Sequence, residues 1–201
     1  MRLFIYFTAA FSLGAIPSAY LAGRFLKNID IRKHGSGNVG ATNAFRVLGK
    51  GPGIVVYFLD FSKGAFPVFL FSYFFADSSN ADFLRMLSGL FSVLGHMFTP
   101  FLGFKGGKGI ATGSGVFFAA YPVLFLAALA CWTVSFWITK IVSISSLLAV
   151  SVLAFFGFWT VAEPSVKSLF AGMLVLVFWS HRSNIRRLIK GEEPGFSKTK
   201  K

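Results

Sequence analysis

The sequence predicts an all-α, polytopic transmembrane helical bundle with about seven spans, forming a single integral-membrane domain over residues 1–201. Three observations predict it. Of the 201 residues, 55% are hydrophobic and only 13% are charged, which is more apolar than a soluble domain of this length needs. The apolar residues fall in long runs, and about 20 such residues cross a bilayer as a helix. Most of the charged residues lie between the runs, and the net charge is +13.

Each expected span is an apolar run between polar segments. The first run resembles a signal peptide, because Arg2 precedes it, but further apolar runs follow it, so we interpret it as a retained helix. The stretch Ile110–Thr139 has 30 uncharged residues, about 45 Å of helix against a hydrocarbon core of about 30 Å. Pro122 marks the point where two shorter helices are expected to meet. The expected spans are 3–22, 53–76, 83–104, two within 110–139, 141–162 and 166–180.

The positions of Lys and Arg predict the orientation of the spans. With seven spans, the loops at 23–52, 104–109, 140 and 181–201 share one side and hold 16 of the 20 Lys and Arg residues. The positive-inside rule then places the N-terminus outside and the C-terminus in the cytoplasm. A single span within 110–139 would place the basic C-terminal segment opposite the first basic loop, against that rule.

The charge and the motif content narrow the function classes. A positive charge in the loops of a membrane protein implies anionic lipids or anionic substrates. Nucleic acid is not expected, because no aromatic-rich soluble module accompanies the basic residues. Cys131 lies inside an apolar run and is expected to pack there. No cysteine pair or HExxH motif indicates zinc, and no GxSxG motif supplies a nucleophile, so no metal site is expected.

The first candidate anion site is the segment GSGNVGATNAFR at 35–46. Closely spaced glycines let backbone N–H groups converge on an anion, and a helix that starts beside them strengthens the site. Arg46 follows Asn43 by about one helical turn, and its planar fork suits a phosphate. A flexible connector would also use glycine and asparagine, but it has no need of the hydroxyls and the arginine. The predicted residues are Ser36, Gly37, Asn38, Gly40, Ala41, Thr42, Asn43 and Arg46.

The second candidate site is a short glycine-rich turn that precedes the apolar run from Ile110. It offers two cations and backbone donors at a helix N-terminus. It is not a Walker A loop, because the GxxxxGK spacing is missing, and GGKG also occurs in ordinary turns. The predicted residues are Lys105, Gly106, Gly107, Lys108 and Gly109.

Two histidines stand close to these polar segments. His96 precedes the second loop, where a lone histidine is more often a hydrogen-bonded structural residue than a catalyst. His181 is followed by Arg182 and Asn184, and on a helix continuing from the last span His181 and Asn184 share a face. A collar of basic side chains at the membrane surface is the alternative, although it has less reason to include His and Asn.

One ionisable pair lies within an expected span. Asp60 and Lys63 are separated by three residues, so they share a helix face. Charges inside a bilayer are costly enough to suggest a function, and Lys63 is a candidate phosphate ligand. A structural ion pair between helices explains the two residues almost as well.

Taken in chain order, four motifs carry a resemblance to a known family. They are GSGNVGATNAFR (35–46), DFSKG (60–64), GHMFTPFLGFKGGKGIAT (95–112) and HRSNIRRLIKGEE (181–193). These segments resemble the motifs of the bacterial acyl-phosphate:glycerol-3-phosphate acyltransferases, the PlsY family. The resemblance covers essentially the whole chain.

The resemblance implies a membrane acyltransferase of phospholipid biosynthesis. The expected reaction moves a fatty acyl group from acyl phosphate to the 1-hydroxyl of sn-glycerol 3-phosphate, giving 1-acyl-glycerol 3-phosphate (lysophosphatidate) and phosphate. It implies no cofactor, and the expected partners are the two substrates and membrane lipid. We expect a monomer in the bacterial cell (inner) membrane, with the active site facing the cytoplasm.

The resemblance also assigns site residues by motif position. The expected catalytic residues are Ser36, Arg46, His181 and Asn184. The remaining positions are expected to bind substrate or phosphate: Gly37, Asn38, Gly40, Ala41, Thr42, Asn43, Lys63, His96, Lys105, Gly106, Gly107, Lys108, Gly109, Arg182 and Glu193. Three points stay open: the acyl-chain preference, which loop binds which phosphate, and which group acts as the base. Two other functions also stay open, an anion transporter and a lipid phosphatase.

Overall fold

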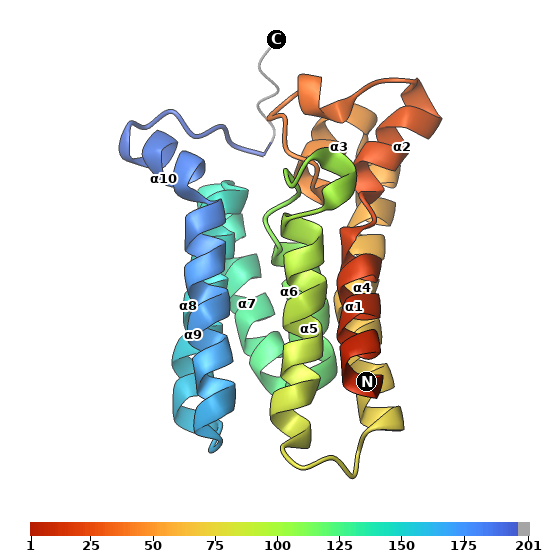
Figure 1. The fold of residues 1–201 in the computed structure, drawn as a ribbon. Helices are drawn as coiled ribbons and strands as arrows, with labels where there is room; N and C mark the ends of the chain where they lie inside the picture. The colour runs from red at the N-terminus through yellow and green to blue at the C-terminus, as the bar shows by residue number, and fades with distance from the viewer. Residues whose placement is uncertain (197–201) are drawn as a thin grey trace. The chain divides into compact units, whose positions relative to one another are not determined.

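A computed structural model describes residues 1–196, and all regular elements of that part of the chain are helices (Figure 1). Lys198, Lys200 and Lys201, which contribute to the basic C-terminal segment, lie outside the described residues. The chain divides into two compact units, one at 1–120 and one that begins at Tyr121, and each is described by itself. The elements are α1 (Arg2–Ala15), α2 (Ser18–Lys27), η1 (Ile31–Lys33), α3 (Ala41–Leu48), α4 (Lys50–Phe74), α5 (Ala81–Met97), η2 (Pro100–Leu102), α6 (Ile110–Ala120), α7 (Pro122–Thr139), α8 (Val142–Thr160), α9 (Pro164–Ser180) and α10 (Arg182–Ile189).

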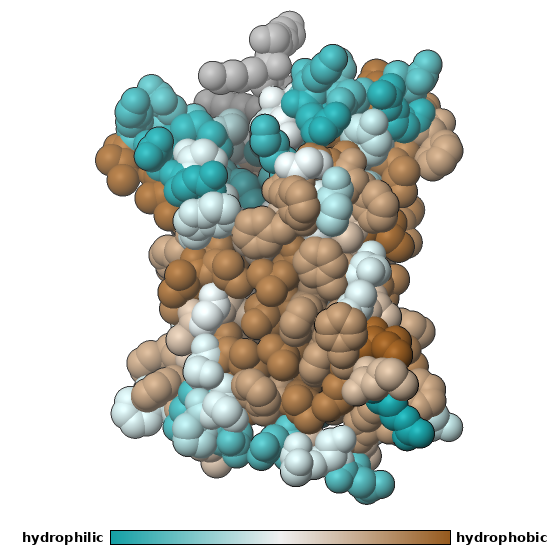
Figure 2. All heavy atoms as spheres, in the orientation of Figure 1, coloured by the Kyte–Doolittle hydropathy of each residue, from teal (hydrophilic) through white to brown (hydrophobic). Residues whose placement is uncertain are grey.

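The helices carry the apolar surface that lipid requires. Four helical stretches among the described residues are long and apolar enough to cross a membrane: 2–27, 50–74, 122–139 and 142–160. Within each unit, apolar side chains cover the middle of the helices and hydrophilic ones gather at the helix ends (Figure 2). Large apolar side chains that point outward include Phe4, Phe58, Tyr73, Trp137, Phe155 and Trp159. Such a surface is expected to face hydrocarbon.

In the first unit, α4 packs against α3, α5 and α6, while α1 packs against α5. The helices approach most closely where glycine replaces a side chain. A Cβ added to Gly115 would overlap the backbone carbonyl of Phe61, and one added to Gly64 would overlap the carbonyl of Thr112. Small residues at such crossings let two backbones pack directly in a membrane bundle. The α4–α6 contact therefore depends on glycine at both faces.

The first apolar run, predicted as one helix, is broken at Pro17. Proline lacks an N–H group and disfavours helical geometry at the preceding residue, here Ile16. The break leaves helix-end carbonyls to be satisfied by other groups. The Thr99 hydroxyl donates to the Ala15 carbonyl at 2.6 Å, and the Lys63 ammonium donates to the Ile16 carbonyl. Side chains from elsewhere in the unit thus complete the end of α1.

Proline also explains two other helix boundaries, one that the sequence analysis predicted wrongly and one that it predicted correctly. The third run was expected to reach Phe104, but α5 ends at Met97 because Pro100 starts the short turn η2. The division of 110–139 is confirmed, since α6 ends at Ala120 and Pro122 begins α7. With 11 residues, α6 is only about 16 Å long, so the number of spans and their orientation stay predictions.

The second unit consists of α7, α8 and α9, with α8 packed between the other two, and the short helix α10. The helix predicted to continue from the last span is instead broken at His181, between α9 and α10. The segment after α10 folds back onto the α7–α8 turn, where the Phe196 N–H donates to the Lys140 carbonyl at 2.8 Å and its ring packs edge-on against Phe136. These two contacts hold the segment after α10 against the α7–α8 turn.

The glycine at the α4–α6 crossing yields a test of the packing. Gly115→Ala should lower the free energy of unfolding by about 1–3 kcal/mol, because the new methyl group must push α4 away. Gly113→Ala on the same helix is the matched control: a Cβ there meets nothing within 4 Å, so removing glycine should raise stability by less than about 1 kcal/mol. Thermal unfolding of both variants in detergent measures the difference, and equal melting temperatures would contradict the close packing.

Candidate functional site

Asn43 holds the first glycine-rich loop in shape. Its side-chain oxygen accepts from the Ser36 N–H at 2.8 Å, and its amide group donates to the carbonyls of His34 and Ile31 at 3.1 and 3.3 Å. The residue is 1% exposed. These contacts tie the loop to itself and to η1 directly before it, so Asn43 acts on loop geometry, and its role in substrate binding stays a prediction.

The loop turns at two glycines with left-handed backbone angles. Gly35 has φ of 62° and Gly37 has φ of 72°, a region that L side chains rarely adopt. A Cβ on Gly35 would also overlap the Asn43 side-chain oxygen. The Gly37 N–H donates to the His34 carbonyl at 3.1 Å, and the Asn38 N–H approaches the Ser36 hydroxyl at 3.5 Å. Several N–H groups of the predicted nest thus serve the turn itself.

The loop ends where α3 begins. Gly40 is the N-cap, and no side chain caps the helix. Ala41 and Thr42 lie in the first turn, where N–H groups have no intrahelical partner. Helix N-termini of this kind favour anions. Arg46 lies about one turn further along α3, as the spacing predicted, and its side chain is half-buried.

The second loop is folded against the end of α5. The Gly106 N–H donates to the Met97 carbonyl at 2.9 Å, and the Gly107 N–H donates to the His96 carbonyl at 3.1 Å. A Cβ on Gly106 would overlap the His96 carbonyl, and one on Gly107 would overlap the His96 ring. These glycines are required for close packing, and the N–H groups expected to face an anion instead complete α5. Their direct contact with phosphate stays a prediction.

The remaining residues of this loop lead into α6. Gly109 has φ of 80°, and its carbonyl accepts from the Gly113 N–H at 2.7 Å in the first turn of α6. Lys108 is half-buried directly before that helix N-terminus, whereas Lys105 is exposed. The helix start at Ile110 agrees with the sequence prediction.

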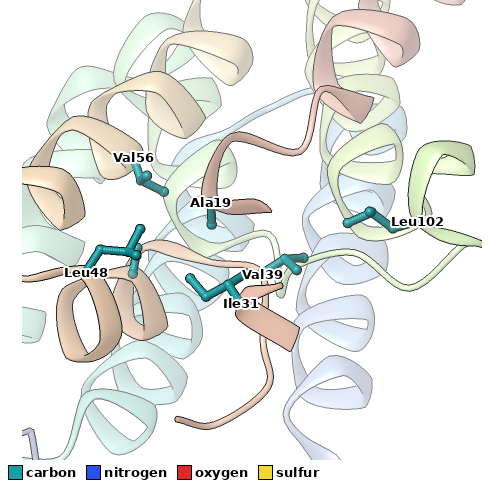
Figure 3. Packing of buried hydrophobic residues seen from close by; sticks show 7 residues of the cluster. Ala19, Ile31, Val39, Leu48, Val56 and Leu102 are labelled. Carbon is teal, nitrogen blue, oxygen red and sulfur yellow. The ribbon is translucent and has the colours of Figure 1, made fainter. Parts of the chain in front are cut away.

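One hydrophobic cluster contains residues of both the first loop and η2. Val39 of the first loop is buried in it together with Ile31 and with Leu102 of η2, the turn that lies shortly before the second loop (Figure 3). The other buried members come from α2, α3 and α4: Ala19, Ala44, Leu48 and Val56. The first loop and the η2 turn that precedes the second loop thus share one apolar cluster.

Basic residues beside the first loop are partly neutralised. Asp30 caps η1 through the Arg32 N–H at 3.0 Å and forms an ion pair with the Arg32 side chain at 2.7 Å. Hydrogen bonds from Arg32 lower the pKa of the Asp30 carboxyl to about 2, against the opposing effect of desolvation. The Arg32 guanidinium also lies 5.2 Å from the centroid of the Tyr20 ring. The Arg32 guanidinium therefore already has two partners within this unit, the Asp30 carboxylate and the Tyr20 ring.

The third motif forms a cluster in the second unit. His181 is buried and its Nδ1 lies 2.8 Å from the Val177 carbonyl; since a carbonyl only accepts, Nδ1 carries a proton. The Asn184 amide donates to Glu193 Oε1 at 2.5 Å, and Arg187 donates to Glu193 Oε2 at 2.7 Å. These bonds fix the ring of His181 and the amide of Asn184. Arg182 is exposed, with its guanidinium over the Trp179 ring at 4.3 Å.

Glu193 also accepts from Ser143 at the start of α8, at 2.7 Å. Burial raises the pKa of this carboxyl, but the hydrogen bonds from Asn184, Ser143 and Arg187 outweigh that effect, so the pKa lies below its ordinary value of 4.5. Glu193 is thus ionised and fully occupied by this unit's own side chains, and its role as a substrate ligand stays a prediction.

The structure places the remaining predicted residues and shows some that the sequence did not reveal. Lys63 lies inside α4, bound to Asp60 and to the Ile16 carbonyl. No sequence pattern indicates the role of Ser143 or the apolar contacts of Val39 and Leu102. Ser143 lies in a Val-Ser-Ile run without a recognisable motif, Val39 lies in a loop and Leu102 lies in the short turn η2, and neither segment has a periodicity.

The fold and the site together define a polytopic helical membrane protein with two glycine-rich loops, each leading into a helix N-terminus. Comparison with known proteins agrees with this class. A profile of the glycerol-3-phosphate acyltransferase family matches residues 4–191.

Similar proteins named glycerol-3-phosphate acyltransferase come from several bacteria. One from Prochlorococcus marinus is 40% identical over 195 residues, 96% of each chain, and one from Staphylococcus saprophyticus is 40% identical over 198 residues, 96% of this chain and 98% of the relative. Two crystal structures of PlsY (YgiH), an integral membrane glycerol 3-phosphate acyltransferase, match with TM-scores of 0.88 and 0.87 at 38% and 37% identity. They cover 98% and 97% of this chain, and this chain covers 96% and 95% of theirs. The chain belongs to the PlsY family and is a membrane glycerol-3-phosphate acyltransferase.

Asn43→Asp tests the loop contacts of this residue. The aspartate keeps an acceptor for the Ser36 N–H but loses both donated bonds and faces two carbonyl oxygens. Such a change costs about 1–3 kcal/mol locally, so amide hydrogen exchange over 31–37 should accelerate by about tenfold or more. Exchange in α5 is the internal control, and unchanged protection of the loop would contradict the assigned role.

Glu193→Gln tests the ion cluster of the second unit through pH. A carboxyl with a lowered folded-state pKa stabilises fully above about pH 4.5, its ordinary value, and the stabilisation is lost as the pH falls through the lowered pKa. The variant should melt below wild type at pH 7, and the gap should close on acidification. Glu192→Gln, which removes the neighbouring exposed charge, should show no such convergence. A gap that stays constant with pH would refute the assignment.

Proposed function

We propose that this acyltransferase uses acyl phosphate as the donor and attaches the acyl group to the 1-hydroxyl of glycerol 3-phosphate, giving lysophosphatidate and phosphate. The observation that carries the proposal is the pair of glycine-rich loops, 35–46 and 105–109. The first loop contributes Val39 to one hydrophobic cluster, and η2, which lies shortly before the second loop, contributes Leu102 to the same cluster. Two substrates that each bear a phosphate suit two such loops. The related PlsY structures are described as a glycerol 3-phosphate form and a lysophosphatidic acid form, which supports this acceptor and product.

The phosphates bind at the starts of α3 and α6. Helix N-termini supply partial positive charge and N–H donors, and a half-buried cation lies close to each, Arg46 on α3 and Lys108 before α6. Arginine offers a planar two-pronged donor, whereas lysine acts as a point charge. Ser36 and Thr42 add hydroxyl groups beside the first helix start.

The reaction needs positioning and charge stabilisation more than a conventional base. The acceptor hydroxyl oxygen attacks the acyl carbonyl carbon, a C–O ester bond forms, and the C–O bond to phosphate breaks. The leaving phosphate accepts the hydroxyl proton. Arg46 and backbone N–H groups stabilise the tetrahedral oxyanion, an effect for which one donor is typically worth about 10²–10³ in rate. Holding both substrates in register supplies a further large factor.

His181 and Asn184 orient the acceptor hydroxyl. The Nδ1 proton of His181 is directed at Val177, so a neutral ring has an acceptor nitrogen at Nε2. The Asn184 amide nitrogen is turned toward Glu193, which leaves its oxygen as the accepting end. Both groups are fixed by contacts inside the second unit, as pre-organised catalytic side chains need to be.

We place the active site on the cytoplasmic face of the bacterial inner membrane, and we expect a monomer. One substrate is water-soluble and the other carries an acyl tail, so a site at the membrane surface serves both. The basic loops follow the positive-inside rule on that face.

A reconstituted assay tests the donor and the reaction. Purified protein in lipid, given acyl phosphate and glycerol 3-phosphate without added metal, should form lysophosphatidate. No product, or product only from acyl-CoA, would overturn the proposal. Phosphate release without acceptor would indicate a phosphatase, and uptake of glycerol 3-phosphate into liposomes without donor would indicate a transporter.

Two variants in the same assay test the loop assignments. Lys108→Ala should raise the KM for glycerol 3-phosphate about tenfold or more, the expected effect of losing a charged hydrogen bond. Arg46→Ala should lower kcat by about 10²–10³. Lys50→Ala removes an exposed cation at the start of α4 and is the charge-matched control. Wild-type kinetics in the first two variants would remove both residues from the site.

A further inference from the structure

An ion pair lies inside the first unit, about midway along α4. Lys63 and Asp60 form it at 2.7 Å, with the Lys63 side chain 6% exposed and the Asp60 side chain 1% exposed. Burying two charges costs about as much as their attraction returns, and an apolar pair is often equally stable. Charged groups at membrane depth therefore call for a role beyond stability.

The pair contacts two other parts of the unit. Lys63 donates to the Ile16 carbonyl at the α1–α2 break, which fixes the ammonium and with it the carboxylate. On the other side, Asp60 Oδ1 lies 3.8 Å from Nδ1 of the His96 ring at the end of α5. The His96 side chain is itself only 7% exposed.

The opposite edge of that ring lies against the second loop. The atom nearest to a Cβ added on Gly107 is His96 Nε2, and the His96 carbonyl accepts the Gly107 N–H. His96 thus contacts Gly107 with both its backbone and its ring. A movement of the ring would displace the loop residue directly before Lys108.

The carboxylate beside Nδ1 is suited to select the state of the ring. At 3.8 Å the contact is longer than a hydrogen bond, but a nearby negative charge favours the tautomer with its proton on Nδ1, as carboxylates do for histidines at other sites. Asp60 Oδ2 is buried and has no hydrogen-bond partner among the described residues. An acceptor is therefore available within a small shift of the ring.

We propose that Asp60, fixed by Lys63, is a positioning residue that sets the orientation and tautomer of His96, and that His96 in turn shapes the Lys105–Gly109 loop for the phosphate of glycerol 3-phosphate. The inference rests on the proposed binding of that phosphate at this loop. Lys63 then acts through Asp60 and touches no substrate. The effect is specific for the acceptor, because the donor phosphate has the other loop.

Steady-state kinetics of Asp60→Asn/Lys63→Met tests the proposal. The double variant removes both charges at nearly constant volume, so no unpaired charge stays buried. We expect the KM for glycerol 3-phosphate to rise about tenfold, with kcat within about twofold and the KM for acyl phosphate unchanged. His96→Asn should have the same effect, and the triple variant should be no worse than His96→Asn, because contacting residues in one chain of action are not additive.

A matched control separates positioning from stability. The buried Ser92 hydroxyl donates to the Lys63 carbonyl at 2.7 Å, so Ser92→Ala should lower the melting temperature without changing either KM. An unchanged KM in the double variant, or effects that add to those of His96→Asn, would overturn the proposal. If Lys108→Ala also leaves the KM unchanged, the proposed phosphate loop itself fails; if it raises the KM, only the positioning role fails.

A second measurement needs no variant. Nitrogen-15 chemical shifts of the His96 ring in the wild-type protein should show a protonated Nδ1 and an unprotonated Nε2. The opposite tautomer would overturn the proposal even if the double variant does not fold.

Discussion

Backbone polar groups at a broken helix end must find new partners when the helix lies in a lipid-facing bundle, because no water is present to satisfy them. In the first unit this requirement meets the site directly. The carbonyls at the end of α1 accept from Thr99 and Lys63, and those at the end of α5 accept from the Gly106 and Gly107 N–H groups. Two of these four groups, the Gly106 and Gly107 N–H groups, belong to the second candidate phosphate loop, and Thr99 lies shortly before it. The shape of that loop and the termination of α5 are therefore coupled.

This coupling changes the meaning of the glycines. A glycine-rich loop is readily interpreted as a set of open N–H groups, yet in both loops several of those groups bond within the protein. Gly35 is needed for its left-handed backbone, and Gly106 and Gly107 are needed because the chain runs directly against α5. Glycine thus brings the backbone into position. In the proposed site, the charge near the anion comes from the following helix start and from Arg46 and Lys108, which gives a reason for each loop to lead straight into a helix.

Much of the fold follows from local chemistry that a sequence contains. Apolar run length predicted the helices, Pro122 predicted the division of 110–139, and the spacing from Asn43 to Arg46 predicted one face of α3. The misses have physical reasons. Pro17 lies in an uninterrupted apolar run, and its effect depends on whether side chains elsewhere can satisfy the carbonyls it exposes. Val39 and Leu102 are far apart in the sequence but belong to one buried cluster, and no periodicity in the sequence indicates that the first loop and η2 pack together. The contacts of Ser143 and Glu193 likewise depend on the return of the chain after α10.

The ion pair in α4 shows how far such long-range dependence extends. From sequence, a structural pair explains Asp60 and Lys63 almost as well as a functional site, because spacing gives only their common face. The structure adds the partners: the Ile16 carbonyl on one side and the His96 ring on the other. The electrostatic interactions of a charge buried there are stronger than in water, because the surroundings have a low dielectric constant. A single carboxylate can therefore influence a loop it does not touch, provided that an intervening ring is held as firmly as His96 is between α4 and Gly107.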